Sequence, residues 1–172
     1  DKYVLDLSFR NDGSSRFASG YRFGNFYSVG AAWNISNENF LADSDIVDDL
    51  KLRASFGQTG NNGIGNNQYQ SLFGYGGAYD NNGAVAPSTF GNLIISWETA
   101  ELLDVGVDFS LFDGRLSGGV TYYEKTTEDL LQSVPLSTTT GHSSQTMNIG
   151  SILNKGVEIE IDAQVLRTKD FS

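Results

Sequence analysis

Residues 103–122 read LDVGVDFSLFDGRLSGGVTY, and this stretch predicts a β-hairpin. Apolar and polar side chains alternate from Leu103 to Leu111 and again from Leu116 to Tyr122, a period of two that is typical of strands with one apolar face. Between the runs lies Asp113-Gly114, a pair that favours a tight two-residue turn because both positions tolerate a positive φ. We therefore expect the two strands to pair antiparallel.

Four further segments alternate in the same way, at 1–10, 27–35, 50–56 and 157–165, and no segment carries a sustained helical period. The last of them holds Glu158 and Glu160 in midstrand, which argues against a parallel strand buried on both faces. The sequence predicts an all-β fold, an antiparallel up-and-down meander with one apolar and one polar face.

The connections between these segments alternate in length. Those at 11–25, 57–97 and 128–154 are long, whereas Asp113-Gly114 and the acidic segment 36–49 belong to the opposite end of the meander. Long loops on one rim and short turns on the other are typical of a transmembrane β-barrel. We expect about six to eight strands of such a barrel. The assignment of the rims requires an even number of strands within 57–97, where 68–73 is a candidate for an extra strand.

The apolar face of such a sheet contacts either lipid or a second sheet. The runs approach the roughly 9 to 11 residues that a tilted strand needs to cross a bilayer. Aromatic residues stand toward the run ends on this face, at Tyr3, Phe9, Tyr27, Trp33, Phe56 and Tyr122. This arrangement resembles interfacial girdles and favours lipid. The alternative is a soluble β-sandwich, an adhesin or glycan-binding module, with the loop at 57–92 as its binding edge.

Composition excludes several classes of function. The 172 residues include 21 acidic and 11 basic side chains, a net charge of −10, which argues against a nucleic-acid partner. The chain contains no cysteine, so a disulfide scaffold and a thiolate metal site are excluded. His142 is the single histidine and lies in a Ser/Thr-rich stretch with no orienting carboxylate beside it, so we expect no enzyme.

The sequence contains pairs and clusters of carboxylates, which can serve catalysis or metal binding but can also be ordinary polar surface. Asp104/Asp108 and Glu158/Glu160 could act as an acid and a nucleophile, but we expect them to line a wet face and to pair with Arg53 or Lys51. A further acidic cluster comprises Asp43, Asp45, Asp48 and Asp49. Calcium is one candidate for it, yet the cluster lacks the glycine and the alternating ligands of a calcium loop. We interpret it as an acidic turn or the start of a short helix, and we expect no metal and no cofactor.

The connection at 57–92 has nine glycines, seven asparagines and Asp80 as its only charged residue. One interpretation is a mobile, solvated loop. The other is a surface for a neutral ligand such as a glycan, because tyrosine rings can stack on sugar faces and amides can hydrogen-bond hydroxyl groups. The candidate ligand-binding residues are Asn61, Asn62, Tyr69, Tyr75 and Tyr79.

Five segments resemble motifs of the SusC/RagA family, the TonB-dependent outer-membrane receptors of Bacteroidetes. They are NDGSSRF at 11–17, DLKLRASFGQTGN at 49–61 followed by IGN at 64–66, WE at 97–98, VPLSTTTG at 134–141, and NIGSILNKGVEIE at 148–160. They follow the order of the family and cover nearly the whole chain.

The resemblance implies a large barrel of about 22 strands in the cell outer membrane, with a plug inside its lumen. Such receptors pair with a SusD-like surface lipoprotein and import glycans or peptides with energy delivered by TonB. The resemblance also implies that residues 1–172 are one internal segment of the barrel wall. The plug and the TonB box are absent from the sequence, so the contacts with TonB are assigned to regions missing here.

Overall fold

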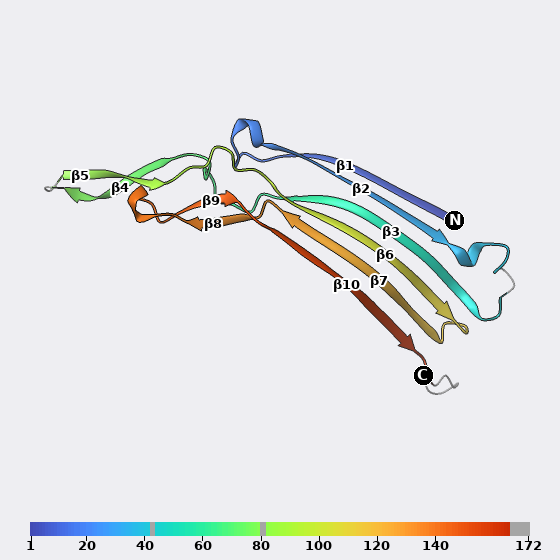
Figure 1. Cartoon of the computed structure of the whole chain (residues 1–172). Helices are drawn as coiled ribbons and strands as arrows, with labels where there is room; N and C mark the ends of the chain where they lie inside the picture. The colour runs from blue at the N-terminus through green and yellow to red at the C-terminus, as the bar shows by residue number, and fades with distance from the viewer. Residues whose placement is uncertain (42–43, 80–81, 166–172) are drawn as a thin grey trace.

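The computed structural model describes residues 1–41, 44–79 and 82–165, except for the side chain of Tyr79. Six long strands form one sheet in the order β1-β2-β3-β6-β7-β10, and every neighbouring pair is antiparallel (Figure 1). Their bounds are β1 (Tyr3–Gly13), β2 (Phe23–Asn34), β3 (Val47–Asn61), β6 (Glu98–Leu111), β7 (Leu116–Glu128) and β10 (Ser151–Ala163). The antiparallel meander predicted from the sequence is confirmed, and each of the six alternating runs forms part of one of these strands.

Two hairpins that the sequence did not predict stand in the long connections. They are β4 (Leu72–Tyr79) with β5 (Asn82–Thr89), and β8 (Leu131–Pro135) with β9 (Ser144–Asn148). With three short 3₁₀-helices, η1 (Ser19–Tyr21), η2 (Ile35–Asn37) and η3 (Thr138–Thr140), they complete the elements of the described residues. Three glycines in β4 remove side chains from the alternating pattern, so periodicity gave no signal there.

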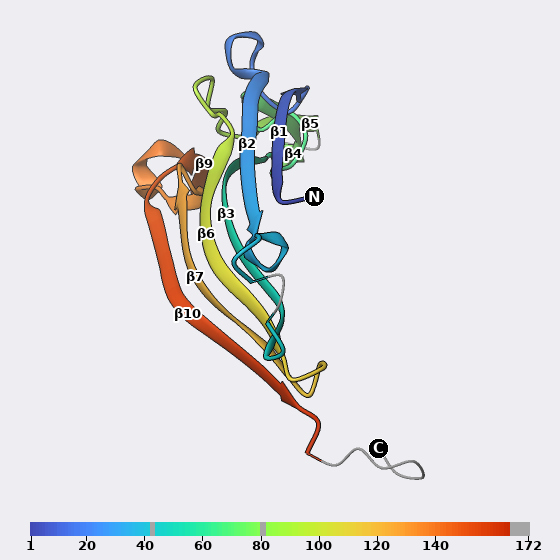
Figure 2. The ribbon, with the colours of Figure 1, turned by 90° about the vertical axis from the view of Figure 1, so that its right-hand side faces the viewer.

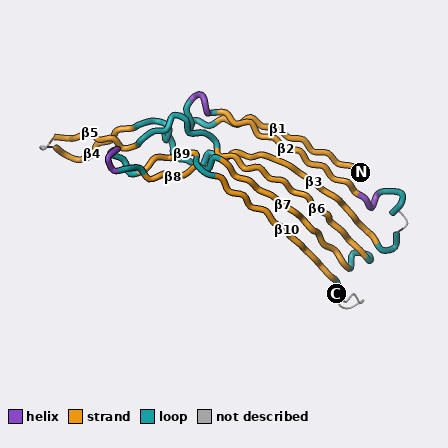
Figure 3. The backbone as a smooth tube through the Cα atoms, in the orientation of Figure 1, coloured by secondary structure: helices purple, strands orange, loops and turns teal. Residues whose placement is uncertain are grey.

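The two ends of the sheet differ as predicted (Figures 1 and 3). The hairpins β4–β5 and β8–β9 lie with η1 at one end, which we call the loop rim. The turn at Asp113-Gly114 lies with η2 at the other end, the turn rim, where the amide of Gly114 donates to Asp48 Oδ2 at 2.9 Å. Two strands lie within 57–97, an even number, so the assignment of the rims is confirmed.

The turn between β6 and β7 has the predicted pair at its centre but is longer than a two-residue loop, because the ladder closes at Leu111 and Leu116. Asp113 and Gly114 have φ values of 56° and 74°, and the amide of Arg115 donates to the carbonyl of Phe112 at 3.3 Å. Positive φ at both central residues matches the right-handed twist of the strands that the turn connects.

The cross-strand register places the apolar residues on a single face. Ala54 pairs with Ala31 of β2 and with Val105 of β6, and Leu52 next to it along the same face pairs with Trp33 and Val107. This apolar face is not covered by a second layer within the described residues, since the sheet is a single curved layer (Figure 2). A soluble β-sandwich would bury this face against a second sheet, and the described residues form no such sheet on it.

The buried apolar side chains lie at the loop rim instead. Phe17 and Ile95 are completely buried, and Ile64 packs with them; we call these three residues the loop core. No helix within the described residues is long and apolar enough to span a membrane.

At the turn rim, Glu38 forms a hydrogen-bonded contact with residues of β1 and β2 and with Lys2. The carboxylate of Glu38 accepts hydrogen bonds from Lys2 Nζ at 3.0 Å, from the Tyr3 hydroxyl at 2.8 Å and from Trp33 Nε1 at 3.2 Å. These bonds, first that of Lys2 and then those of the two aromatic residues, lower the pKa of Glu38 from its ordinary value. Glu38 therefore stays ionised at neutral pH.

The orientation of the apolar face can be tested with Val107→Arg in the full-length protein. If this face contacts lipid, a cation at mid-strand should lower the free energy of unfolding by about 2–4 kcal/mol. Ser55→Arg, on the opposite face of the neighbouring strand β3, is the control and should have little effect. Denaturant unfolding in bilayers measures both variants, and equal losses would contradict the assignment of the faces.

Candidate functional site

The loop rim is built on the loop core, which joins three connections distant in sequence. Phe17 comes from the connection at 11–25, and Ile64 and Ile95 come from that at 57–97. The side chains of Tyr69 and Trp97, and of Leu131 from the connection at 128–154, pack against them. The Trp97 ring lies 5.4 Å from the Phe17 ring. The loop rim is therefore a packed structure rather than a set of independent loops.

Phe26 extends this packing into the strands. It is 4% exposed, its ring lies 5.5 Å from that of Trp97, and it covers Gly60. A Cβ at position 60 would lie 2.0 Å from the Phe26 ring, so glycine is required there. Because the alternating pattern assigns Phe26 to the polar face of β2, periodicity alone could not identify it as a buried residue.

Two of the predicted ligand-binding residues bond within the protein. The amide of Asn61 donates to Glu98 Oε1 at 3.1 Å, and that of Asn62 donates to Ser14 Oγ at 3.0 Å. Arg16 Nη1 donates to the carbonyl of Asn62 at 2.9 Å. These bonds attach the first connection and the start of β6 to the end of β3.

The three predicted tyrosines are divided between two places. Tyr69 is half-buried against the loop core, and its hydroxyl accepts from Gln70 Nε2 at 3.1 Å. Tyr75 is 93% exposed on β4, in the hairpin that projects away from the sheet (Figure 1). Tyr79 ends the same strand, and its side chain lies outside the described part of the chain. The structure thus brings Asn61, Asn62 and Tyr69 to the base of the rim and places Tyr75 apart from them.

A polar cleft of about 190 Å³, which no sequence pattern indicated, lies between the connections at 57–97 and 128–154. It is lined by uncharged polar side chains together with one aromatic pair, in which the His142 ring stacks on Phe90 with centroids 5.0 Å apart. Gln145 Nε2 donates to the carbonyl of Gly91 at 2.7 Å and holds the two walls together. The lining residues are Gln68, Ser88, Thr89, Phe90, His142, Ser143, Ser144, Gln145 and Thr146. No sequence pattern could join these segments, because they are far apart along the chain.

On the polar face of the sheet, Arg53 of β3 forms hydrogen bonds with side chains of β6 and of β7, the next strand beyond it. Nη1 donates to Asp104 Oδ1 at 2.5 Å, Nε to Asp108 Oδ2 at 3.2 Å, and Nη2 to Thr121 Oγ1 at 2.5 Å. Gly106 lies beneath the guanidinium, where a Cβ would be 2.8 Å from Arg53 Cζ. The predicted pairing of these two carboxylates with Arg53 is confirmed, and it ties β3 to β6 and β7.

The acidic segment at the turn rim makes ordinary turn contacts. Asp48 accepts the amide of Gly114, and Asp49 Oδ1 accepts the hydroxyl of Ser36 at 2.9 Å, while Asp43 lies outside the described residues. Asp48 and Asp49 belong to β3, so the prediction of an acidic turn or a short helix does not hold for them, and Asp45 is the cluster member that lies in the bend within the described residues.

The whole chain, residues 1–172, matches the family model described as TonB dependent receptor-like, beta-barrel. The chain belongs to this family. It is 41% identical to TonB-dependent receptor P39 of Formosa agariphila over 171 residues, which are 99% of this chain and 16% of that protein. It is 38% identical to TonB-dependent receptor SusC of Bacteroides thetaiotaomicron over 184 residues, which cover 100% of this chain and 18% of SusC.

Solved structures agree with this TonB-dependent receptor assignment. The RagAB peptide importer in its closed-closed state superposes with a TM-score of 0.90 at 38% identity, over 97% of this chain and 18% of that chain. The open-open state gives a TM-score of 0.85 over 98% of this chain and 18% of that chain. The resemblance to SusC/RagA receptors is confirmed, and the chain spans 16% to 18% of the length of these relatives.

The role of Arg53 in the barrel wall can be tested with Arg53→Met. The substitution leaves Asp104 and Asp108 as neighbouring unpaired carboxylates, and because the cluster is partly exposed, the free energy of unfolding should fall by about 1–2 kcal/mol at low salt. The triple variant Arg53→Met/Asp104→Asn/Asp108→Asn should recover most of the loss. Equal stability of the single variant and the parent would show that the cluster does not hold the strands.

The bonds of Asn62 can be tested with Asn62→Ala. Loss of the bond to Ser14 should raise the exchange rate of backbone amides at 14–17 about fivefold, which corresponds to roughly 1 kcal/mol. Asn66→Ala, an exposed asparagine of the same connection, is the matched control. Hydrogen exchange with mass spectrometry on the full receptor measures both, and unchanged exchange in the first variant would contradict a structural role for this amide.

Proposed function

We propose that the full-length receptor imports an oligomeric nutrient across the outer membrane, with energy from TonB and together with a SusD-like surface lipoprotein. The segment described by residues 1–172 supplies part of the barrel wall, of the lumen face and of the outward loops. The observation that carries the proposal is the family match over every residue, supported by the close fit to one part of RagAB. The long loop rim would face outward and the turn rim the periplasm.

The chemistry of the loop rim supports a neutral ligand with many hydroxyl or amide groups. The cleft beside Phe90 and His142 offers Gln, Ser and Thr side chains, and its described lining includes no Asp, Glu, Lys or Arg. On the projecting hairpin, Tyr75 and Phe73 are exposed by 93% and 69%. Exposed rings can cover an apolar sugar face while hydroxyl and amide groups pair with the substituents of the sugar.

We propose an oligosaccharide as the ligand, and a peptide is the second candidate. The peptide is favoured by the likeness to RagAB, which is named a peptide importer. The same uncharged cleft could pair with a peptide backbone, so the two candidates share this chemistry and differ in how much they use the exposed rings. The proposed binding surface has two parts. Its base, next to the loop core, comprises Asn61, Asn62 and Tyr69, and its outer part, on the β4–β5 hairpin, comprises Tyr75 and Tyr79.

The proposal assigns transport rather than catalysis to this segment. The His142 ring stacks on Phe90, and the Asp104 and Asp108 carboxylates accept bonds from one guanidinium, so structural roles account for two of the three candidate catalytic groups.

The transport proposal is tested by deleting the gene in its native cell and measuring uptake of labelled oligosaccharides and peptides. One ligand class should stop entering the cell, and removal of TonB should have the same effect. Uptake of both classes at the parental rate in the deletion strain would contradict the proposal.

The role of the hairpin is tested with Tyr75→Ala/Tyr79→Ala in the receptor bound to its lipoprotein partner. Loss of two ring contacts should weaken binding of an oligosaccharide about tenfold or more, as measured by calorimetry. Tyr21→Ala, at the same rim in η1 and 41% exposed, is the matched control. Unchanged affinity in the double variant would return the hairpin to its other interpretation, a solvated connection.

A further inference from the structure

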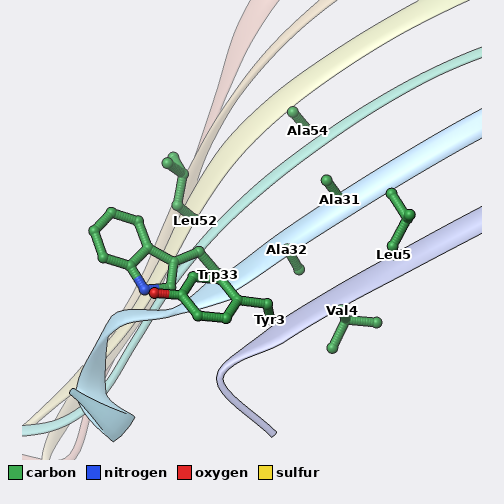
Figure 4. Close-up of a pocket in the computed structure, with 8 residues that line it drawn as sticks. All are labelled: Tyr3, Val4, Leu5, Ala31, Ala32, Trp33, Leu52 and Ala54. Atoms are coloured by element: carbon green, nitrogen blue, oxygen red, sulfur yellow. The ribbon is translucent and has the colours of Figure 1, made fainter.

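A hollow lies on the apolar face of β1, β2 and β3, near the turn rim (Figure 4). Its volume is about 380 Å³. Ala31 and Ala54 are register partners and form its floor, while Leu5 and Leu52 stand on either side. Two short side chains among long ones leave a groove in a face that is otherwise covered by large apolar residues. We call it the alanine groove.

Two aromatic rings close the turn-rim end of the alanine groove. The Tyr3 and Trp33 rings are stacked, with centroids 6.2 Å apart and planes inclined by 20° (Figure 4). The hydroxyl of Tyr3 and the Nε1 of Trp33 both donate to Glu38, which fixes the orientation of the two rings. Because these bonds fix the two rings, the end of the groove that they form is ordered before any ligand binds. Tyrosine and tryptophan side chains, which have one polar and one apolar end, are also favoured at the membrane–water interface.

An ion pair of opposite charges lies at the polar side of these rings. Lys2 Nζ donates to Glu38 Oε2, and the Lys2 side chain remains 41% exposed. An ammonium group carries three donors, and within the described part of the chain Lys2 uses one of them on Glu38, so two remain for an external acceptor. Among the described residues, Glu38 Oε2 accepts from Lys2 alone, which leaves capacity for one further donor.

We propose that the alanine groove binds one phosphatidylethanolamine molecule of the periplasmic leaflet. One acyl chain lies over Ala31 and Ala54, the phosphate accepts from Lys2, and the primary ammonium donates to Glu38. The proposal rests on the proposed outer-membrane function, because the apolar face must contact lipid. The bound lipid would fix the depth of the turn rim in the bilayer.

Charge complementarity selects this headgroup over others. A phosphate and an ammonium on one headgroup match a lysine and a glutamate that lie side by side. A choline headgroup has no N–H to donate to Glu38, and a glycerol headgroup has no positive charge to offer it. The site should therefore prefer phosphatidylethanolamine to phosphatidylcholine and to phosphatidylglycerol.

Native mass spectrometry of the full-length receptor in mild detergent tests the site. The probes are the three phospholipids with identical acyl chains, each titrated alone. One phosphatidylethanolamine should bind about tenfold more tightly than phosphatidylcholine, the effect of one charge-assisted hydrogen bond. Glu38→Gln should remove this preference, and Lys2→Gln should weaken phosphatidylethanolamine about tenfold.

Ala31→Leu/Ala54→Leu fills the groove without adding charge and should abolish retention of the lipid. Two matched controls lie on the same face outside the groove, Val120→Leu for added volume and Lys155→Gln for lost charge, and both should bind as the parent does. Correct folding of each variant is checked by heat-modifiable migration on gels.

Equal affinity for all three lipids, or full retention in the filled variant, would overturn the proposal. If TonB-dependent uptake persists in that case, only the lipid site fails. A receptor that remains in solution without detergent would overturn the lipid site and the outer-membrane function together.

Discussion

The cross-strand register is the constraint on which the rest of this structure depends. Ala54 of β3 pairs with Ala31 on one side and Val105 on the other, and the same registration continues from β1 to β10. A slip of one residue would exchange the two faces of a strand, because side chains alternate with a period of two. The slip would place Arg53 on the apolar face and remove its bonds to Asp104 and Asp108. Register therefore determines both the apolar face and the polar network opposite it.

The sheet itself buries almost nothing, and this distinguishes it from a soluble domain. Leu5, Ile159 and Ile161 are about two-thirds exposed, whereas Phe17 and Ile95 of the loop core are fully buried. The backbone ladder and the bonds of the polar face hold the strands, and the loop core orders the connections at one end. The outer edges of β1 and β10 have no partner strand within the described residues. In a closed barrel, further strands would pair with these edges.

The two rims use different chemistry to order the chain. At the loop rim, asparagine amides and backbone groups satisfy one another around the loop core, as in the bond of Asn148 Nδ2 to the carbonyl of Ser96 at 3.0 Å. At the turn rim a charged group orders the chain, because the Glu38 carboxylate accepts hydrogen bonds from Lys2, Tyr3 and Trp33. Charged groups are present at both rims but have different partners. Arg16 and Glu98 at the loop rim bond to asparagine residues, whereas Lys2 and Glu38 at the turn rim bond to each other.

The sequence by itself determined the six long strands, their faces, the turn at Asp113-Gly114 and the two rims. These features are local, because alternation and turn propensity act within a few residues of one another. Tertiary structure alone decided which loop residues meet. Asn61 and Asn62 have the composition of a ligand site but bond to Glu98 and Ser14, and the cleft at Phe90 and His142 has no sequence pattern at all. The alanine groove likewise exists only because register places Ala31 beside Ala54, and contacts between distant segments are set by packing rather than by local preference.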